Sequence, residues 1–251
     1  LLCIHDLEVP FYEPFGLKTT VIGNPAISRH VQGDAIRFRQ THHIPETEKI
    51  LLVLPGSRPS EIKRVAPELV EAVRKLKSND PSLNIVFMPA SNVASQFSEA
   101  FPVLNDWAIV SSDPGVRYDA MAAADLALAC SGTVTTELAM QDTPMIVAYK
   151  TGWITWTLAR GLLYSKRHIT LLNIVSDDQE IVPEFVQTRQ KAHDIAAKAQ
   201  DWLDNPNELA AQLNRQRKAL ERMKEGDRDA SEIAAGVILE EAAARSAGAI
   251  S

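Results

Sequence analysis

The sequence predicts an α/β fold in which helices cover both faces of a parallel sheet. Short apolar runs that end at Gly, Pro or polar residues alternate with segments of helical periodicity. The chain has 251 residues, enough for one large domain or two modest ones, and it contains no internal repeat. This alternation is typical of a doubly wound, Rossmann-like domain, which we place at residues 48–190.

The expected elements of this domain follow one another without a long interruption. Strands are predicted at 50–54, 84–90, 107–111, 125–132 and 144–149. Shorter helices are predicted at 93–101, 116–124 and 134–141. Between the first two strands, apolar residues recur at helical spacing from Ile62 to Leu76, and Pro67 inside this pattern predicts a kink or a late helix start.

Two further segments flank this domain. Residues 1–47 begin in an apparent strand, without an initiator Met, and hold a strand and turn at 19–25. We interpret them as the end of a truncated N-terminal domain and the crossover into the next. Residues 191–251 are predicted to be helical, with breaks at 205–206 and 226–227, and their leucines at 209, 213 and 220 form a stripe suited to helix packing.

The composition excludes several classes of protein. The net charge of −6 argues against bulk nucleic-acid binding. Two cysteines, Cys3 and Cys130, form neither a disulfide framework nor a metal cluster, which fits a reducing, cytoplasmic compartment. No apolar run approaches the roughly 18–20 residues that span a bilayer, and no signal peptide is visible.

The first candidate site follows the predicted strand at 50–54, because ligands of open parallel sheets bind beyond the carboxyl ends of the strands. Gly56 and Ser57 allow a ligand close to the backbone, and free amides before a helix attract anions. Arg58 can bind a phosphate through two parallel hydrogen bonds. The alternative is an ordinary turn with Arg58 in solvent.

The second candidate site follows the predicted strand at 125–132. Ser131, Gly132 and Thr133 offer hydroxyls and amides at the positive end of a helix, where a phosphate is stabilised. Glu137 lies about one turn further on, and an acid in this place can accept hydrogen bonds from a ribose diol. The alternative is structural, with Thr133 as an N-cap and Glu137 complementing the helix dipole.

Three blocks resemble one known family in their order and spacing. "LLVLPGSRPSEIKR" is followed about 75 residues later by "SGTVTTELAMQDTPMIVAYK" and then by "LLNIVSDDQEIVPEFVQ". These blocks are similar to those of lipid-A-disaccharide synthases, and the resemblance covers nearly the whole chain. Two details depart from the family: Asp6-Leu7-Glu8 stands where Pro-Phe-Glu is usual, and Asn24 stands where His is usual. Both lie outside the expected nucleotide site.

The resemblance implies a glycosyltransferase of the GT-B type, built from two Rossmann-like domains, that uses neither metal nor cofactor. The donor would be UDP-2,3-diacylglucosamine and the acceptor 2,3-diacylglucosamine 1-phosphate (lipid X). The products would be a β(1→6)-linked disaccharide 1-phosphate and UDP. The acceptor 6-hydroxyl would attack the anomeric carbon with inversion, and UDP would leave. The general base is expected upstream of Leu1.

The same resemblance assigns roles within the donor site. Without a metal, charge on the leaving diphosphate must be met by a cation and amides, so Arg58 is the expected electrophilic clamp. Gly56 and Ser57 would approach the donor. The diphosphate would also contact Ser131, Gly132 and Thr133. Glu137 would hold the ribose, and Asn173 would lie near the donor. Gln187 matches a family block without a known role. The histidines lie outside the matched motifs and are expected to be structural or at the surface: His5, His30, His42, His43, His168 and His193.

A basic, Trp-bearing segment at 150–168 suggests a membrane contact. Trp153 and Trp156 share a helix face, and Lys150, Arg160, Lys166 and Arg167 flank them without any acidic residue between. Such a helix suits the interface of an anionic membrane, and the family is peripheral to the inner face of the inner membrane. The alternative is that these residues pack within the fold or across a dimer interface. For the C-terminal helices at 191–251, the resemblance separately implies that they can be exchanged between the protomers of a homodimer.

Other functions remain open from the sequence alone. The chain can be a fragment that binds a UDP-sugar without catalysing transfer. It can be another GT-B enzyme that uses UDP-GlcNAc, such as an epimerase or a glycosyltransferase of peptidoglycan synthesis. It can also be a plain α/β module that uses the Trp-bearing segment for protein contact.

Overall fold

The computed structural model describes residues 1–28, 31–152, 167–224 and 229–248. The chain forms two compact units: Val31–Arg217, and Leu1–His30 together with Lys218–Ser251. The domain boundaries expected from the sequence, after residues 47 and 190, both fall inside the larger unit. The difference arises because helices α3 (Ala35–Thr41) and α11 (Ala192–Asp204) pack against helices of the sheet domain.

The described part of the larger unit contains one six-stranded sheet, in the order β5-β4-β3-β6-β7-β8. The strands are β3 (Ile50–Leu54), β4 (Asn84–Phe87), β5 (Ile109–Val110), β6 (Leu126–Cys130), β7 (Met145–Tyr149) and β8 (Glu184–Val186). All neighbouring pairs are parallel. This is the strand order of a doubly wound nucleotide-binding sheet, so the predicted fold class is confirmed.

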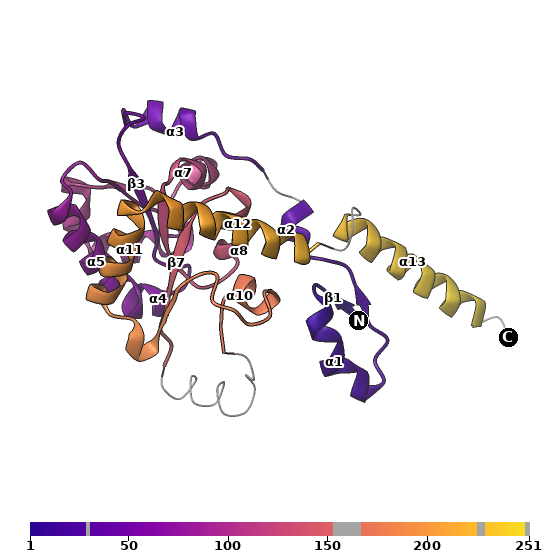
Figure 1. Cartoon of the computed structure of the whole chain (residues 1–251). Coiled ribbons are helices and arrows are strands. Elements are labelled where there is room, and N and C mark those ends of the chain that lie inside the picture. The colour runs from indigo at the N-terminus through magenta and orange to yellow at the C-terminus, as the bar shows by residue number, and fades with distance from the viewer. Residues whose placement is uncertain (29–30, 153–166, 225–228, 249–251) are drawn as a thin grey trace. The chain divides into compact units, whose positions relative to one another are not determined.

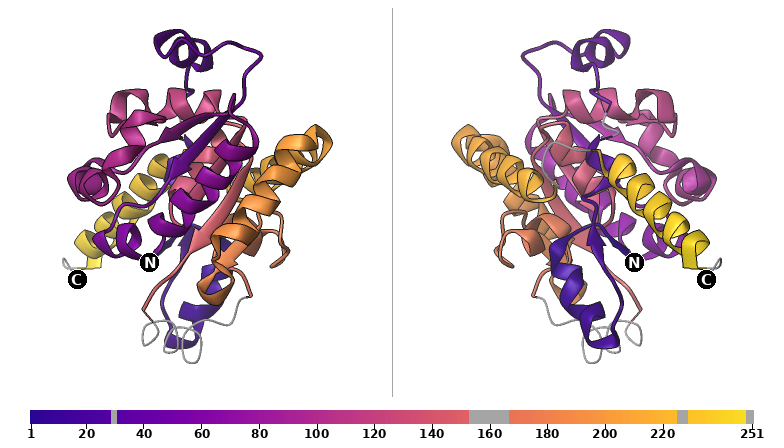
Figure 2. Two further views of the ribbon diagram at one scale, coloured as in Figure 1. Left: turned by 90° about the vertical axis from the view of Figure 1, so that its left-hand side faces the viewer. Right: turned by 90° about the vertical axis from the view of Figure 1, so that its right-hand side faces the viewer.

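The helices of this unit connect the strands and cover the sheet. They are α4 (Pro59–Arg64), α5 (Ala66–Asn79), α6 (Ala94–Ala100), α7 (Arg117–Ala123), α8 (Val134–Met140) and α10 (Leu171–Val175), with α12 (Pro206–Arg222) following α11. Helices α5 and α11 lie side by side (Figures 1 and 2). Alternate strand residues such as Leu51, Val53 and Leu128 are buried in one cluster together with the apolar faces of α5 and α11.

The predicted disturbance near Pro67 is present. The helix is divided at Val65 into α4 and α5, and Pro67 lies in the first turn of α5, where its missing N–H costs no intrahelical bond. Strand β8 and helix α10 were not predicted from the sequence. Both are very short, and Glu184 opens β8 with a charged residue at a buried position.

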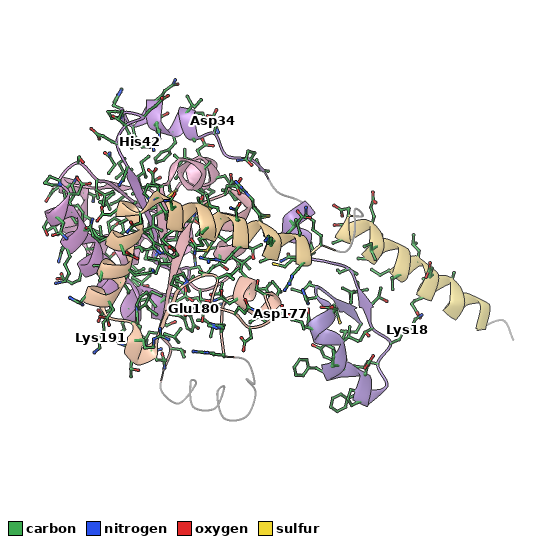
Figure 3. The ribbon with its side chains drawn as sticks, in the orientation of Figure 1. Lys18, Asp34, His42, Asp177, Glu180 and Lys191 are labelled. Carbon is green, nitrogen blue, oxygen red and sulfur yellow. The ribbon has the colours of Figure 1, made fainter. Side chains whose placement is uncertain are left out.

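Helix α3 lies in a segment that the sequence suggested to be a connection. The Asp34 side chain caps it by accepting a hydrogen bond of 2.9 Å from the Arg37 amide (Figure 3). Asp119 of α7 is buried and accepts two bonds of 2.7 Å from the Arg37 guanidinium. Gly33 passes so close to α7 that a Cβ there would lie 2.0 Å from the Tyr118 carbonyl oxygen. These contacts hold α3 beside α7 (Figure 1).

The smaller unit contains a parallel pair of short strands, β1 (Leu2–Cys3) and β2 (Thr20–Val21), in agreement with the strands expected there. Its helices are α1 (Val9–Tyr12), α2 (Pro25–Ser28) and α13 (Ala230–Gly248). Ile22, Ala230 and Ile233 form its small buried cluster. No helix in the described ranges is long and apolar enough to cross a bilayer.

Candidate functional site

A cavity of about 220 Å³ lies beyond the carboxyl ends of the central strands. Its walls come from the segments that follow β3, β4, β5 and β6. Five residues predicted from the sequence line it together: Gly56, Ser57, Ser131, Gly132 and Thr133. Strands β3 and β6 are neighbours although two strands separate them in sequence, so the two loops meet at the point where the strand order reverses.

The turn after β3 is built around a buried carboxylate that the sequence analysis did not select. Glu61 accepts hydrogen bonds of 2.7 Å from the Ser57 amide and 3.1 Å from the Arg58 amide. The amides expected to be free for an anion are therefore occupied by an anion from the chain itself. A Glu three residues after a helix N-cap is the available sequence signal for this contact.

Gly56 is required by the geometry of this turn. Its φ of +127° is a conformation that residues with a side chain rarely adopt, and a Cβ would lie 2.6 Å from the Glu61 carboxylate. The Ser57 carbonyl accepts a bond of 2.8 Å from the Asn92 side chain, so the peptide between Ser57 and Arg58 is held on both sides, by Asn92 and by Glu61.

The loop after β6 keeps its hydroxyls available. Thr133 occupies the N-cap position of α8, but its side chain makes no capping hydrogen bond there. Thr135, two residues after Thr133, is buried and donates to the Gly132 carbonyl at 2.8 Å, which stabilises the turn. Ser131 and Thr133 therefore face the cavity from a braced loop.

Two ion pairs flank the cavity. Arg58 pairs with Glu61 at 3.1 Å, and Arg117 of α7 pairs with Glu137 of α8. The described residues that line the cavity include Glu61 and Arg117 but neither Arg58 nor Glu137. The structure thus places the partners of the two predicted charged residues at the cavity wall. Arg117 is the cationic wall residue that sequence reasoning missed, because it lies on a helix without a recognisable motif.

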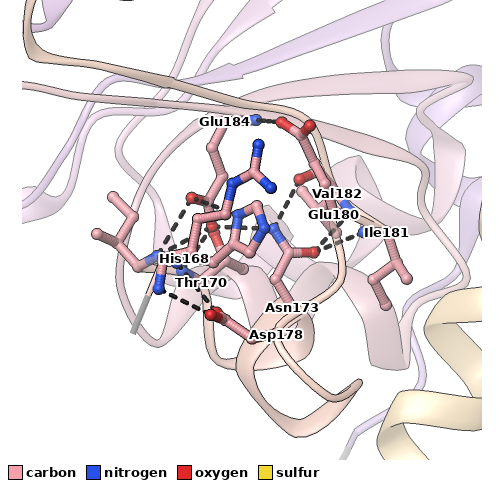
Figure 4. A network of polar contacts seen from close by, with 10 residues as sticks. His168, Thr170, Asn173, Asp178, Glu180, Ile181, Val182 and Glu184 are labelled. Atoms are coloured by element: carbon pink, nitrogen blue, oxygen red, sulfur yellow. Dashed lines mark hydrogen bonds and ion pairs between the residues drawn. The ribbon is translucent and has the colours of Figure 1, made fainter. Parts of the chain in front are cut away.

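Asn173 lies away from the cavity, in a buried polar network (Figure 4). Its amide nitrogen donates to the Val182 carbonyl and to the Glu184 carboxylate, at 2.8 and 2.9 Å. Its oxygen accepts from the amides of Ile181 and Val182, at 2.9 and 2.8 Å. An Asn side chain has two donors and two acceptor positions, so none remains for a donor substrate.

Glu184 is the centre of the same network. Its carboxylate also accepts from the amides of Ile169 and Thr170, and it lies 3.3 Å from the His168 ring. The network fixes the turn between α10 and β8. Nearby, Gln187 adopts φ +55° and its side-chain oxygen accepts 2.8 Å from the Thr151 amide, which ties β8 to the end of β7.

The histidines fit the structural or surface places expected for them, as far as the described residues extend. His5 accepts a capping bond from the Leu7 amide, His193 is exposed beside Asp194, and burial lowers the pKa of His42. His30 and both tryptophans expected at the membrane, Trp153 and Trp156, lie outside the described residues.

A buried thiol forms part of the cavity wall. Cys130 ends β6 in the cavity wall with an exposed fraction of 2%, and this burial, reinforced by the negative charge of Glu61, raises the pKa of its thiol. Burial likewise raises the pKa of Tyr149 at the end of β7. Charged groups at this depth therefore interact more strongly than they would in water.

Comparisons with known proteins identify the family of the chain. A family model described as lipid-A-disaccharide synthetase matches residues 1–238. The lipid-A-disaccharide synthase of Rickettsia felis is 34% identical over 244 residues, which are 96% of this chain and 61% of that protein. The chain therefore spans about three fifths of the length of the curated relatives that it matches.

Solved structures show the same fold at low sequence identity. WaaG, a glycosyltransferase involved in lipopolysaccharide biosynthesis, aligns with a TM-score of 0.54 and 15% identity, over 88% of this chain and 58% of that one. A UDP-GlcNAc 2-epimerase from Neisseria meningitidis, bound to UDP-GlcNAc, aligns with a TM-score of 0.60 and 12% identity, over 95% and 61%. The GT-B fold expected from the sequence is confirmed.

Asn173→Ala tests the structural role of the polar network. The substitution leaves two buried amides and part of the Glu184 carboxylate without partners, so we expect the free energy of unfolding to fall by about 2–4 kcal/mol. Urea denaturation measures this, with Asn105→Ala, an exposed asparagine, as the control. A stability equal to that of the control variant would contradict the assignment.

Alkaline pH tests the buried thiol. Because the pKa of Cys130 is raised above its ordinary value of 9.0, the unfolded chain loses this proton at a lower pH than the folded chain. The thiol's contribution to the free energy of unfolding is complete below the unfolded pKa of 9.0. Above this pH the contribution decreases by about 1.4 kcal/mol per pH unit. Urea denaturation between about pH 8 and pH 10 should therefore show a smaller decline for Cys130→Ala than for the wild type. Equal declines in the stability of the two proteins would contradict a raised pKa of the Cys130 thiol.

Proposed function

The chain belongs to the family of lipid-A-disaccharide synthases, and on this basis we propose that it carries the donor site of a lipid A glycosyltransferase. The donor is UDP-2,3-diacylglucosamine, bound in the cavity between the loops after β3 and β6. The acceptor is 2,3-diacylglucosamine 1-phosphate. The observation that carries the proposal is the convergence of Gly56, Ser57 and Ser131–Thr133 on one cavity at the reversal of strand order.

The proposed reaction is a single displacement. The acceptor 6-hydroxyl oxygen forms a bond to the anomeric carbon, and the bond from that carbon to the UDP oxygen breaks with its electron pair leaving on UDP. The hydroxyl proton passes to a general base, which we assign to none of the described residues. The product is a β(1→6)-linked disaccharide 1-phosphate.

The charges around the cavity support stabilisation of the leaving diphosphate. Arg117 lines the cavity, and Arg58 lies on the turn that forms its wall. Arginine forms bidentate hydrogen bonds with phosphate oxygens, and cations in a poorly hydrated site stabilise developing charge more than in water. Glu137, beside Arg117, is the proposed ribose ligand once that pair rearranges. Asn173 is left out of this set because its hydrogen bonds are all internal.

Two alternatives use the same cavity. A fragment that binds the donor without turnover would bind UDP and fail to form disaccharide. A GT-B enzyme acting on UDP-GlcNAc is favoured by the epimerase neighbour, whose structure holds UDP-GlcNAc. Turnover separates the first alternative from the proposal. A requirement for acyl chains on the donor separates the second, because only the lipid A enzyme requires an acylated donor.

Calorimetric titration with UDP tests the donor site. We expect Arg58→Ala to weaken binding about tenfold or more, since a charge-assisted hydrogen bond to a phosphate contributes about 1.5–3 kcal/mol. Glu137→Ala should weaken binding as well. Arg74→Ala removes one positive charge from an exposed position on α5 and is the control. No UDP binding by the folded wild-type chain would contradict the proposal.

We also propose that the enzyme works at the inner face of the inner membrane, where the acylated substrates reside, and that it forms a homodimer. The support for membrane contact is the sequence at 150–168, which carries two tryptophans and basic residues in a chain of net charge −6.

Sedimentation with vesicles tests the membrane contact. The variant with Trp153→Ser and Trp156→Ser should sediment less with vesicles that contain anionic lipid than the wild type does, because interfacial burial of two indole rings is lost. Trp107→Ser, a tryptophan of the sheet domain, is the control. Equal sedimentation of the double variant and the wild type, both folded, would argue against the contact.

A further inference from the structure

The first turn of α4 violates a local rule of helix formation. Its N-cap position is occupied by Arg58, whose side chain makes no capping hydrogen bond. Arginine offers no acceptor, whereas Ser, Thr, Asp and Asn at this position stabilise a helix relative to residues that cannot cap. A residue that is unfavourable for the local structure indicates a functional reason for its presence.

Glu61 replaces the missing cap and also contacts the arginine. One carboxylate oxygen accepts from the Ser57 and Arg58 amides, and the other accepts from Arg58 Nη1 at 3.1 Å. The Glu61 side chain is only 6% exposed, whereas Arg58 is 70% exposed. A single buried carboxylate therefore holds both the backbone and the guanidinium of the same residue.

This arrangement leaves most of the guanidinium available. Nη1 is the guanidinium nitrogen engaged within the described residues, and Nε and Nη2 have no acceptor there. An arginine carries five N–H donors in a fixed planar fork, so holding one corner limits the orientation of the rest. A free arginine side chain loses rotamer entropy when it is immobilised on a ligand, and prior anchoring reduces that cost.

From these contacts we infer that Glu61 is a positioning residue for Arg58, which it orients toward the diphosphate of the nucleotide. The inference rests on the proposed function, because it names how the same cavity recognises a diphosphate. Glu61 supports the turn through the Ser57 and Arg58 amides, and its effect on the diphosphate passes through the Arg58 guanidinium. Its own negative charge in the cavity wall is balanced by the pair, so the diphosphate meets an oriented cation rather than an uncompensated carboxylate.

Glu61→Gln tests this inference with two ligands. The amide oxygen of Gln can still accept from the turn, but the charge that holds Arg58 is lost. We expect about tenfold weaker binding of UDP and unchanged binding of uridine, which has no diphosphate. Glu99→Gln, an exposed acid on α6, is the control for net charge. If Glu61→Gln fails to fold, Glu61→Asp replaces it in this test. Asp retains the charge, but its shorter side chain reaches Arg58 less well, so we expect the same selective loss of UDP binding.

A double-mutant cycle separates positioning from general support of the fold. If Glu61 acts through Arg58, Glu61→Gln should not weaken UDP binding further in the Arg58→Ala background. A parallel loss for UDP and uridine, or a further loss in that background, would overturn the inference and make Glu61 a purely structural residue.

Tighter or unchanged UDP binding by Glu61→Gln would also overturn the inference, because it would mean that the carboxylate competes with the diphosphate or is indifferent to it. In each of these cases the wild-type chain binds UDP and the proposed function stands. A folded wild-type chain that binds no UDP would overturn the proposed function and this inference with it.

Discussion

The pairing of β3 with β6 is the constraint on which the site depends. Both strands are buried along all five residues, and their register sets Leu51 beside Leu126 and Leu54 beside Ala129. A strand buried on both faces gains stability from apolar contact on each side, so this register is strongly specified. Because the pairing is parallel, the residues after Leu54 and after Cys130 emerge at one edge, and the cavity forms between them.

The charges at this edge are arranged in pairs rather than as a single-sign patch. Glu61 and Arg117 line the cavity, and each holds the residue that the sequence suggested for the nucleotide, Arg58 and Glu137. Within each pair the two opposite charges balance, which avoids burying an isolated charge near Cys130. Binding of an anion then requires these hydrogen bonds to be shared or exchanged, so affinity depends on how the pairs are held.

Much of the fold was predictable because its signals are local. The apolar runs at 50–54 and 144–149 and the break before Pro67 are properties of neighbouring residues. The two small-residue loops were predictable for the same reason. The contact of Glu61 with its own helix start has a local signal too, but Arg117 reaches the cavity only through the packing of α7, which no local pattern encodes. Strand β8 was missed because Glu184 stands where an apolar residue is expected.

Asn173 shows why resemblance alone does not separate a ligand-binding residue from a structural one. The block "LLNIVSDDQEIVPEFVQ" was matched to the family as a unit. Its asparagine, however, makes all four of its hydrogen bonds to the turn that leads into β8. The same block ends at Gln187, whose side chain fixes Thr151 at the end of β7. Asn173 thus fixes the turn that leads into the edge strand β8, and Gln187 ties the end of β8 to the end of β7, the neighbour of the strand that borders the cavity. Their contribution to function passes through the geometry of the sheet edge, whereas Glu61 and Arg58 act at the cavity itself.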